Sequence, residues 1–300
     1  MTKIAKPSNS ITVTGTLVDH SLVVRESQNN RTFINGKIVL DTSVEPGQSN
    51  EVTLNVLQFA DKRDKNDKSK MVPDDRFQTV ANLLENGIGN TVRVSASYNN
   101  SVFLAQSGEA VKGSQMQAGF FSTSNPGKFK ADFKVTGVIK RIEPEMVQEQ
   151  ETGNVIVALD VFNYNGSMII PKTFVVDKDN VMAKKYFLES GQIDAGDVTD
   201  LWGRIENQTT TKFVESAWGE TQEVEGNSRL VAIITGARKT PYDLDEDLEE
   251  QVKGARQAYN VFVDEQIKNA QERKAKKEAE SGISTTKSQE TAPKKGQFDF

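Results

Sequence analysis

Alternating hydrophobic and polar positions run through the first 60 residues of the chain. Residues 11–18 (ITVTGTLV), 31–40 (RTFINGKIVL) and 50–59 (NEVTLNVLQF) show the period of two that is typical of half-buried strands. The segments between them contain the Asn, Gly, Pro and Ser residues expected of turns. These patterns predict a meander of three strands.

The period then changes to that of a helix. Apolar residues recur on one helical face at Phe77, Val80, Ala81 and Leu84. Gly87 can end this helix in a left-handed conformation. Two further strand-like runs, 90–98 and 101–105, are separated by Asn99 and Asn100, a pair that tolerates the positive φ of tight turns. The predicted order is three strands, one helix and two strands.

The same order returns after residue 130. Strand-like runs at 132–142, 154–162 and 168–176, a helical segment at 181–191, and strand-like runs at 197–205 and 211–218 follow one another. The triplet Val-Thr-Gly occurs at 13–15 and again at 135–137, and Leu-Glu-x-Gly occurs at 84–87 and 188–191. A repeat of this length indicates duplication. Residues 229–237 are predicted to form an additional strand.

Five strands with one helix between the third and the fourth is the element order of the oligonucleotide-binding (OB) barrel, a small Greek-key barrel. The predicted fold class is mainly β, with two tandem OB-fold-like five-stranded barrels, each with one short helix, then a C-terminal helix and a disordered tail. A pair of β-sandwiches is the competing architecture, and the recurring helix disfavours it. The predicted boundaries are 1–112 for the first barrel, 113–130 for a linker or long loop, 131–240 for the second barrel, 241–280 for the helix and 281–300 for the tail.

The C-terminal helix is predicted from charge order and from one apolar stripe. The segment begins with acidic residues around Asp243 and Asp247 and ends with Lys274 and Lys277, an order that suits the helix dipole. The stripe consists of Leu248, Val252, Ala255, Tyr259, Phe262 and Ile267. We therefore expect the helix to dock on a barrel or on another copy of itself, and the polar segment after residue 280 to be disordered.

Charge is distributed unevenly along the chain, whose net charge is −5. Residues 1–130 contain 15 Lys and Arg against 12 Asp and Glu, a balance of +3, whereas 131–240 contain 12 against 17, a balance of −5. A surface for a polyanion is therefore expected in the first barrel. The absence of cysteine excludes disulfides and thiolate sites and favours a reducing compartment. With no signal peptide and no apolar span, we expect a cytoplasmic protein without a membrane partner.

The chain offers few residues for catalysis. Its single histidine, His20, has no cysteine or second histidine with which to form a relay or a zinc site, and it is predicted to be a turn residue. We therefore expect a non-enzymatic protein without a metal site or cofactor.

A basic groove with interspersed rings is the usual single-strand site of such barrels. The candidate residues of the first barrel are Phe33, Lys37, Phe59, Lys62, Arg63, Lys65, Lys68, Lys70, Arg76, Arg93, Tyr98 and Phe103. Each ring could instead be a core residue, and the charged segment 61–70 could be a solvated hairpin. The second barrel contains Phe162, Tyr164, Lys172, Phe174, Trp202, Arg204 and Lys212, but its excess of acid suits pairing or partner contacts better.

Tandem barrels, an acidic C-terminal region and a tail that ends in Phe298, Asp299 and Phe300 resemble phage and bacterial single-stranded DNA-binding proteins. In that family the tail tip docks on replication and recombination proteins. Lys294 and Lys295 depart from the family's acidic run. The resemblance implies a protein, phage-encoded and acting in the host cytoplasm, that coats single-stranded DNA without sequence preference, contacts replication or recombination proteins through its tail and can form a homo-oligomer. The alternative is a phage structural, assembly or adaptor protein whose barrels bind protein.

Overall fold

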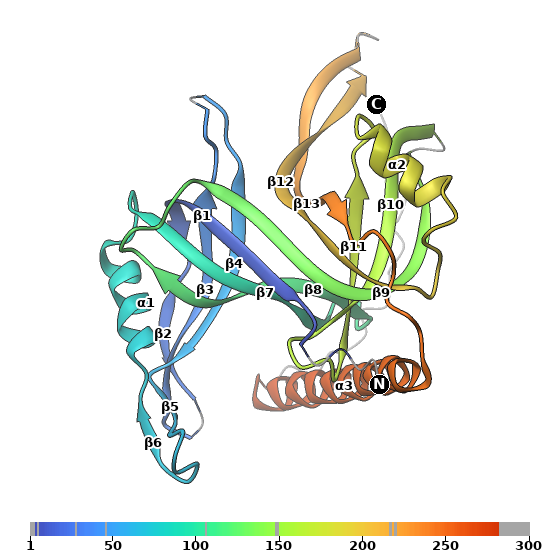
Figure 1. The fold of residues 1–300 in the computed structure, drawn as a ribbon. Helices are drawn as coiled ribbons and strands as arrows, with labels where there is room; N and C mark the ends of the chain where they lie inside the picture. The colour runs from blue at the N-terminus through green and yellow to red at the C-terminus, as the bar shows by residue number, and fades with distance from the viewer. Residues whose placement is uncertain are drawn as a thin grey trace, which may run out of the picture.

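In the first half of the chain, five long strands and one helix form a barrel (Figure 1). They are β1 (Asn9–His20), β3 (Thr32–Asp41), β4 (Glu51–Phe59), α1 (Asp75–Asn86), β7 (Thr91–Leu104) and β8 (Ala110–Ser122). The antiparallel pairs are β1 with β3, β3 with β4, β1 with β7, and β7 with β8. A parallel pairing of β4 with β8, at Asn55 and Gln117, closes the barrel. The computed structural model describes residues 4, 6–27, 29–45, 47–105, 107–147, 150–215, 218 and 221–281.

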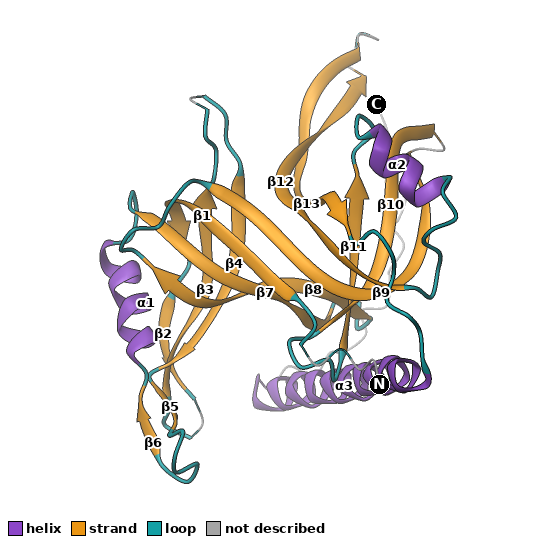
Figure 2. Ribbon diagram, in the orientation of Figure 1, coloured by secondary structure: helices purple, strands orange, loops and turns teal. Residues whose placement is uncertain are grey.

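Three short strands extend this barrel. β2 (Val23–Glu26) pairs with β3, while β5 (Asp61–Arg63) and β6 (Met71–Pro73) pair only with each other. The β5–β6 hairpin projects away from the barrel just before α1 (Figure 2). The charged segment 61–70 therefore forms one strand and the turn of this hairpin.

The second half repeats the arrangement. Its elements are β9 (Lys130–Val147), β10 (Gln150–Phe162), β11 (Ile169–Val176), α2 (Val181–Leu188), β12 (Val198–Glu215) and β13 (Thr221–Ala237). The pairings β9 with β10, β10 with β11, β9 with β12, and β12 with β13 are antiparallel, and β11 pairs with β13 in parallel at Val175 and Ile233. Both halves have the OB order of strands. The prediction of two tandem OB-like barrels with one short helix each is confirmed.

The two barrels share a sheet and a core. Residues 9–14 of β1 pair with residues 130–135 of β9, so one sheet of 11 strands runs through both halves. At the junction, the ring of Phe174 lies 6.0 Å from Tyr98 and 5.0 Å from Phe133, measured between centroids. One hydrophobic cluster contains buried side chains from both halves. Packing across the junction therefore couples the stabilities of the two barrels.

The repeated Val-Thr-Gly triplet has a structural cause. A Cβ on Gly15 would lie 2.2 Å from the carbonyl oxygen of Asp41, and a Cβ on Gly137 would lie 2.5 Å from that of Asp160. Each glycine thus allows the first strand of its barrel to approach the second closely. Gly87 also permits a close approach, because a Cβ there would lie 2.3 Å from the Leu83 carbonyl oxygen. Its φ of −83° shows that the predicted left-handed helix end is wrong at this residue.

Both halves differ from the sequence prediction in their last two strands. β7 runs without a turn through Asn99 and Asn100, which pair with Gln115 and Ser114 of β8. The prediction of a linker or long loop over 113–130 is therefore wrong for residues 113–122, and a boundary at 112 falls inside β8. In the second half, 197–205 and 211–218 were expected as separate strands, but β12 runs from 198 to 215, and 229–237 is the end of β13, not an additional strand.

The C-terminal helix α3 (Glu246–Ser281) docks on the second barrel. Leu248, Val252 and Ala255 are buried against Phe162 and Ile169. Arg256 donates to the Asp160 carboxylate at 3.0 and 3.1 Å. The expectation that the helix docks on a barrel is confirmed, although Val263 is buried where the predicted stripe has Phe262. The predicted disorder of 281–300 concerns, from residue 282 onward, the part of the chain outside the described residues. None of the described helices is long and apolar enough to span a membrane.

Candidate nucleic-acid interface

The outer surface of β3 and β4 brings two of the predicted rings together. Phe33 is paired with Phe59 across the strands, and the ring centroids lie 5.4 Å apart with an angle of 39° between the ring planes. Alternation places Asn35, Lys37, Asn55 and Leu57 on the same surface, because Ile34, Ile38, Leu54 and Val56 point into the core. We call the six residues Phe33, Asn35, Lys37, Asn55, Leu57 and Phe59 the β3–β4 face. Leu57 is 50% exposed and both rings are partly exposed, so the face presents apolar surface and amides to solvent.

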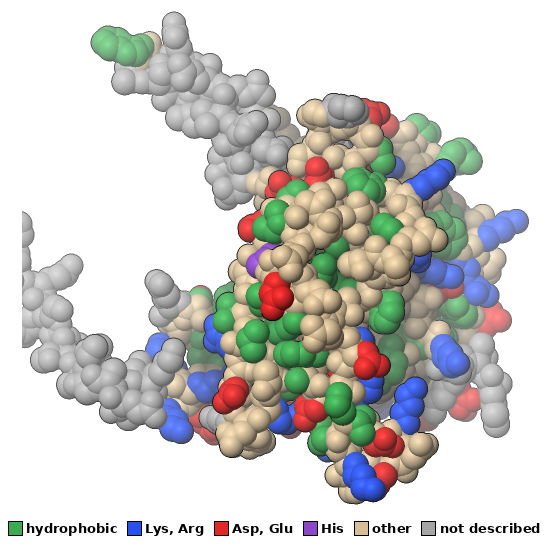
Figure 3. Space-filling view, turned by 90° about the vertical axis from the view of Figure 1, so that its left-hand side faces the viewer, with side chains coloured by type: hydrophobic (Ala, Val, Ile, Leu, Met, Phe, Trp, Pro, Cys, Tyr) green, Lys and Arg blue, Asp and Glu red, His purple; other side chains and the backbone are tan. Residues whose placement is uncertain are grey.

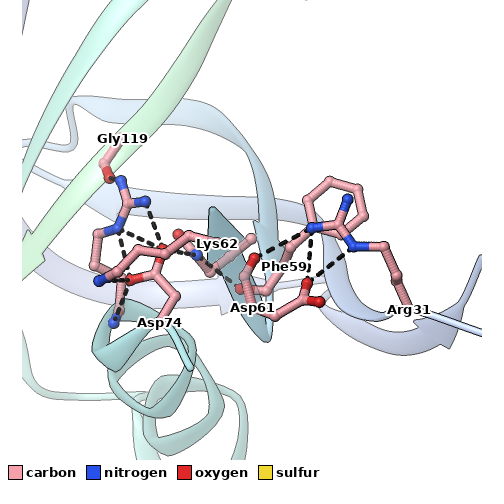
Figure 4. Close-up of polar contacts among 8 residues, drawn as sticks. Arg31, Phe59, Asp61, Lys62, Asp74 and Gly119 are labelled. Carbon is pink, nitrogen blue, oxygen red and sulfur yellow. Dashed lines mark hydrogen bonds and ion pairs between the residues drawn. The ribbon is translucent and has the colours of Figure 1, made fainter. Parts of the chain in front are cut away.

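Arg31 covers one ring of this face. Its guanidinium carbon lies 4.4 Å from the centroid of the Phe59 ring, a cation–π contact. Arg31 also donates from Nε and Nη2 to Oδ1 of Asp61 at 2.9 and 2.7 Å (Figure 4). The two side chains remain 37% and 30% exposed, so water screens this ion pair. The Arg31 charge is thus held beside the ring and partly compensated.

Asp74 is the centre of a second cluster beside the face (Figure 4). Its carboxylate is 2% exposed, accepts from Arg76 Nη2 at 2.5 Å and Gln58 Nε2 at 3.1 Å, and lies 3.4 Å from Lys62 Nζ. It also caps α1 by accepting from the Arg76 backbone N–H. The hydrogen bond from the Arg76 side chain, opposed in part by burial, holds the pKa of Asp74 well below its usual range. Lys62 and Arg76 therefore have a structural role at the base of the hairpin.

The tip of the β5–β6 hairpin carries the cations without such partners. Among the described residues, none of Arg63, Lys65 and Lys68 has a carboxylate within ion-pair distance, whereas Lys70 lies 3.4 Å from Asp67. Asp64 and Asp67 accept backbone hydrogen bonds within the turn, which lower their pKa. Figure 3, in which the hairpin is the lowest part of the view, shows lysine or arginine beside acid there. The hairpin offers mobile-length cations around an ordered acidic turn.

The remaining first-barrel candidates lie elsewhere. Arg93 is exposed on the outside of β7, opposite Ser122. Phe103 is 55% exposed in the β7–β8 hairpin, and β7 contacts α3. Tyr98 is 1% exposed and packs on Phe174 at the barrel junction, and burial raises its pKa. Its assignment as a stacking ring is therefore wrong, because the core covers both sides of the ring.

The second-barrel rings divide between core and surface. Phe162 and Phe174 are buried, whereas Tyr164 and Trp202 are 78% and 40% exposed. The Nζ of Lys172 lies 5.2 Å from the centroid of Tyr98, and burial lowers its pKa. The predicted partner-binding residues Phe298, Asp299 and Phe300 lie outside the described residues.

Sequence reasoning missed Arg31, Asp61 and Asp74. The pattern Asp-Asp-Arg at 74–76 before a helical period is an N-cap signal that could have identified Asp74. Arg31 and Asp61 adjoin Phe33 and Phe59 in the sequence, but only the register of β3 and β4 brings them together. His20 ends β1, and its Nδ1 accepts from the Leu22 backbone N–H at 3.4 Å. No group of three His, Asp or Glu in the described part of the chain could hold a metal ion.

Comparison with known proteins gives two solved structures and one family. A deletion variant of the single-stranded DNA-binding protein from Thermus aquaticus aligns with a TM-score of 0.49 and 14% identity over 81% of this chain and 99% of that chain. The wild-type protein aligns with a TM-score of 0.47 and 12% identity over 81% and 97%. No curated protein matches the sequence. The YorF family model matches residues 7–281, and the chain belongs to the YorF family.

Proposed function

We propose that this protein binds single-stranded DNA without sequence preference through the β3–β4 face and the β5–β6 hairpin. The observation that carries the proposal is the paired Phe33 and Phe59 rings, which are partly exposed on the second and third strands of an OB barrel. In OB barrels these two strands form the surface that receives oligonucleotides. Rings on such a surface stack on bases of any sequence, since every base has a π-face.

Charge around the rings supports the same ligand. Lys37 on the face and Arg63, Lys65 and Lys68 on the hairpin are exposed, and no described carboxylate lies within ion-pair distance of them. Uncompensated cations of this kind attract a phosphate backbone and release its counterions on binding. Arg31 adds a planar cation that is already placed over Phe59. Amide side chains at Asn35 and Asn55 can donate to bases or phosphates without selecting a sequence.

The proposed activity is binding and protection, without catalysis. A role in replication or recombination, and contacts of Phe298, Asp299 and Phe300 with proteins of those processes in a host cytoplasm, are part of the same proposal. Their support is the resemblance of the tail sequence to the single-stranded DNA-binding family.

Fluorescence anisotropy with labelled oligo-dT at several salt concentrations tests the proposal. We expect binding by the full chain that weakens linearly in log–log form with salt, at roughly 0.7 per phosphate contact. Equal binding of oligo-dT and mixed-sequence strands, with weak binding of duplex of the same length, is expected of a ring-and-cation surface. Absence of binding at low salt would contradict the proposal and favour a surface for protein partners.

A further inference from the structure

A polar groove of about 610 Å³ lies where the first barrel meets the outside of the second. One wall is Gly113 and Ser114 of β8, and the remainder comes from three strands of the second barrel. These contribute Lys140 and Arg141 of β9, residues 158–160 of β10 and residues 171–173 of β11. This volume is within the usual range of ligand sites, about 300–1,000 Å³.

A β-bulge places two consecutive cations in this groove. Ala158 of β10 is paired with Arg141, but the next residue, Leu159, is paired with Ile139, so Lys140 is the extra residue. In a regular strand, neighbouring side chains point to opposite faces. Here Lys140 and Arg141 are both exposed and both line the groove. Bulges often redirect side chains in this way beside functional sites.

The groove holds more positive than negative charge. Lys140, Arg141 and Lys172 line it together with one carboxylate, Asp160, which is paired with Arg256 of α3. Arg141 lies 3.1 Å from Glu143 in an exposed pair, which screening weakens. Lys172 has no carboxylate within ion-pair distance among the described residues, and the Tyr98 ring is its cation–π partner. A buried ammonium without an anion costs free energy, so an anion in the groove would stabilise its charged form.

β8 links the groove to the β3–β4 face (Figure 1). Gln117 is paired with Asn55 of that face, and residues 117, 115 and 113 share one side of β8. Gly113 lies four residues from Gln117, about 13 Å along the strand at roughly 3.3 Å per residue. The side chains between the two surfaces are the amides Gln117 and Gln115. A strand that leaves the face along β8 therefore reaches the groove over polar surface.

We infer that this groove between β8 and the β9–β10–β11 surface is a second single-strand site, which takes the phosphodiester backbone of DNA already bound on the β3–β4 face. The inference rests on the proposed function. It also locates the contribution of the second barrel, whose overall balance of −5 suggests weak binding, in a local excess of cations.

Oligonucleotide length separates the two sites. We expect Lys140→Ala/Arg141→Ala to leave affinity for a dT strand of about 8 nucleotides unchanged, since one OB barrel occupies about 4–16 nucleotides. With a strand of about 30 nucleotides, it should lower affinity several-fold and reduce the salt slope by about 1.4, at roughly 0.7 per cation. Lys172→Gln should lower affinity for the long strand alone. The control is Lys178→Ala/Lys185→Ala, which removes two exposed cations of the same half that do not line the groove.

A unique thiol gives an independent readout, because the chain has no cysteine. A Cβ on Gly113 meets no heavy atom within 4 Å, so Gly113→Cys should fold normally. The long strand should slow alkylation of this thiol at least several-fold, whereas the short strand and inorganic phosphate should not. A Lys185→Cys control on α2 should react at one rate throughout.

The two hypotheses fail differently. If the wild-type protein binds neither strand, the proposed function is wrong. If it binds both strands but the Lys140→Ala/Arg141→Ala variant equals wild type on the long strand, or if inorganic phosphate alone protects the Gly113→Cys thiol, the groove is not a path for DNA and the inference is overturned.

Discussion

The Phe33 ring lies opposite the Phe59 ring on neighbouring strands, with 5.4 Å between the centroids. Both rings are partly exposed, while the residues that alternate with them, Ile34 and Gln58, are buried. The pair is therefore an element of the surface that the core holds in place from below. Core packing requires only the inward side chains, so two adjacent outward rings indicate a use at the surface.

Phe33→Ala and Phe59→Ala should each weaken oligo-dT binding by about 1–3 kcal/mol, the value of one stacked base, and leave the salt slope almost unchanged. Anisotropy titrations at three salt concentrations measure both quantities. Tyr164→Ala, which removes an exposed ring of the second barrel, is the control. A double variant that is fully folded and binds with wild-type affinity would remove both rings from the site.

Tyr98→Ala should act on folding and not on stacking. The ring is 1% exposed between the barrels, so its loss should cost about 3–5 kcal/mol, as for other large-to-small changes in cores. Urea unfolding followed by circular dichroism measures this. Because Tyr98 contacts Phe174 of the second half, both barrels should lose stability in one transition. A variant with wild-type stability but weaker DNA binding would contradict the assignment of Tyr98 to the core.

Arg63→Ala/Lys65→Ala/Lys68→Ala should reduce the slope of log K against log salt by about 2, at roughly 0.7 per contact. The melting temperature should stay unchanged, because these exposed side chains have no ion pair with a described carboxylate. Lys178→Ala/Lys185→Ala is the matched control for loss of charge. An unchanged slope in the triple variant would show that the hairpin does not touch phosphates.

The barrels followed from sequence, but their last two strands did not. Period-two patterns identified β1, β3 and β4 and their counterparts, because one side of each strand faces the core. Beyond Tyr98, β7 pairs with β8 through Asn99 to Phe103, largely outside the barrel core, and its polar sequence has no inward alternation to detect. Asn99 and Asn100 therefore looked like a turn. The candidate site was predictable as a set of rings and cations, but not as a geometry. Only the register shows that Phe33 meets Phe59, and that Asp74 engages Lys62 and Arg76.

Asp74 should make stability depend on acid. The pKa of Asp74 in the folded state is lowered, chiefly by the Arg76 hydrogen bond, so its contribution is present above the unfolded value of about 3.9 and is lost as pH falls toward the folded value. Asp74→Asn should cost about 1–2 kcal/mol near pH 7, after allowance for screening of the partly exposed Lys62 and Arg76. The difference between variant and wild type should shrink as pH approaches about 3. Urea titrations at several pH values measure it, and a difference independent of pH would refute the assignment.

Gly15→Ala and Gly137→Ala test why the Val-Thr-Gly triplet is repeated. In either barrel the new methyl group would lie 2.2–2.5 Å from a backbone carbonyl oxygen of the neighbouring strand, which cannot move aside as a flexible side chain can. Each substitution should force the first two strands apart and cost about 1–3 kcal/mol or more, the usual range for overpacking. Gly113→Ala is the matched control, since a Cβ there meets no atom within 4 Å and should leave stability unchanged. Differential scanning calorimetry compares the three variants. Equal melting temperatures in all three would mean that the triplet does not hold β1 against β3 and β9 against β10.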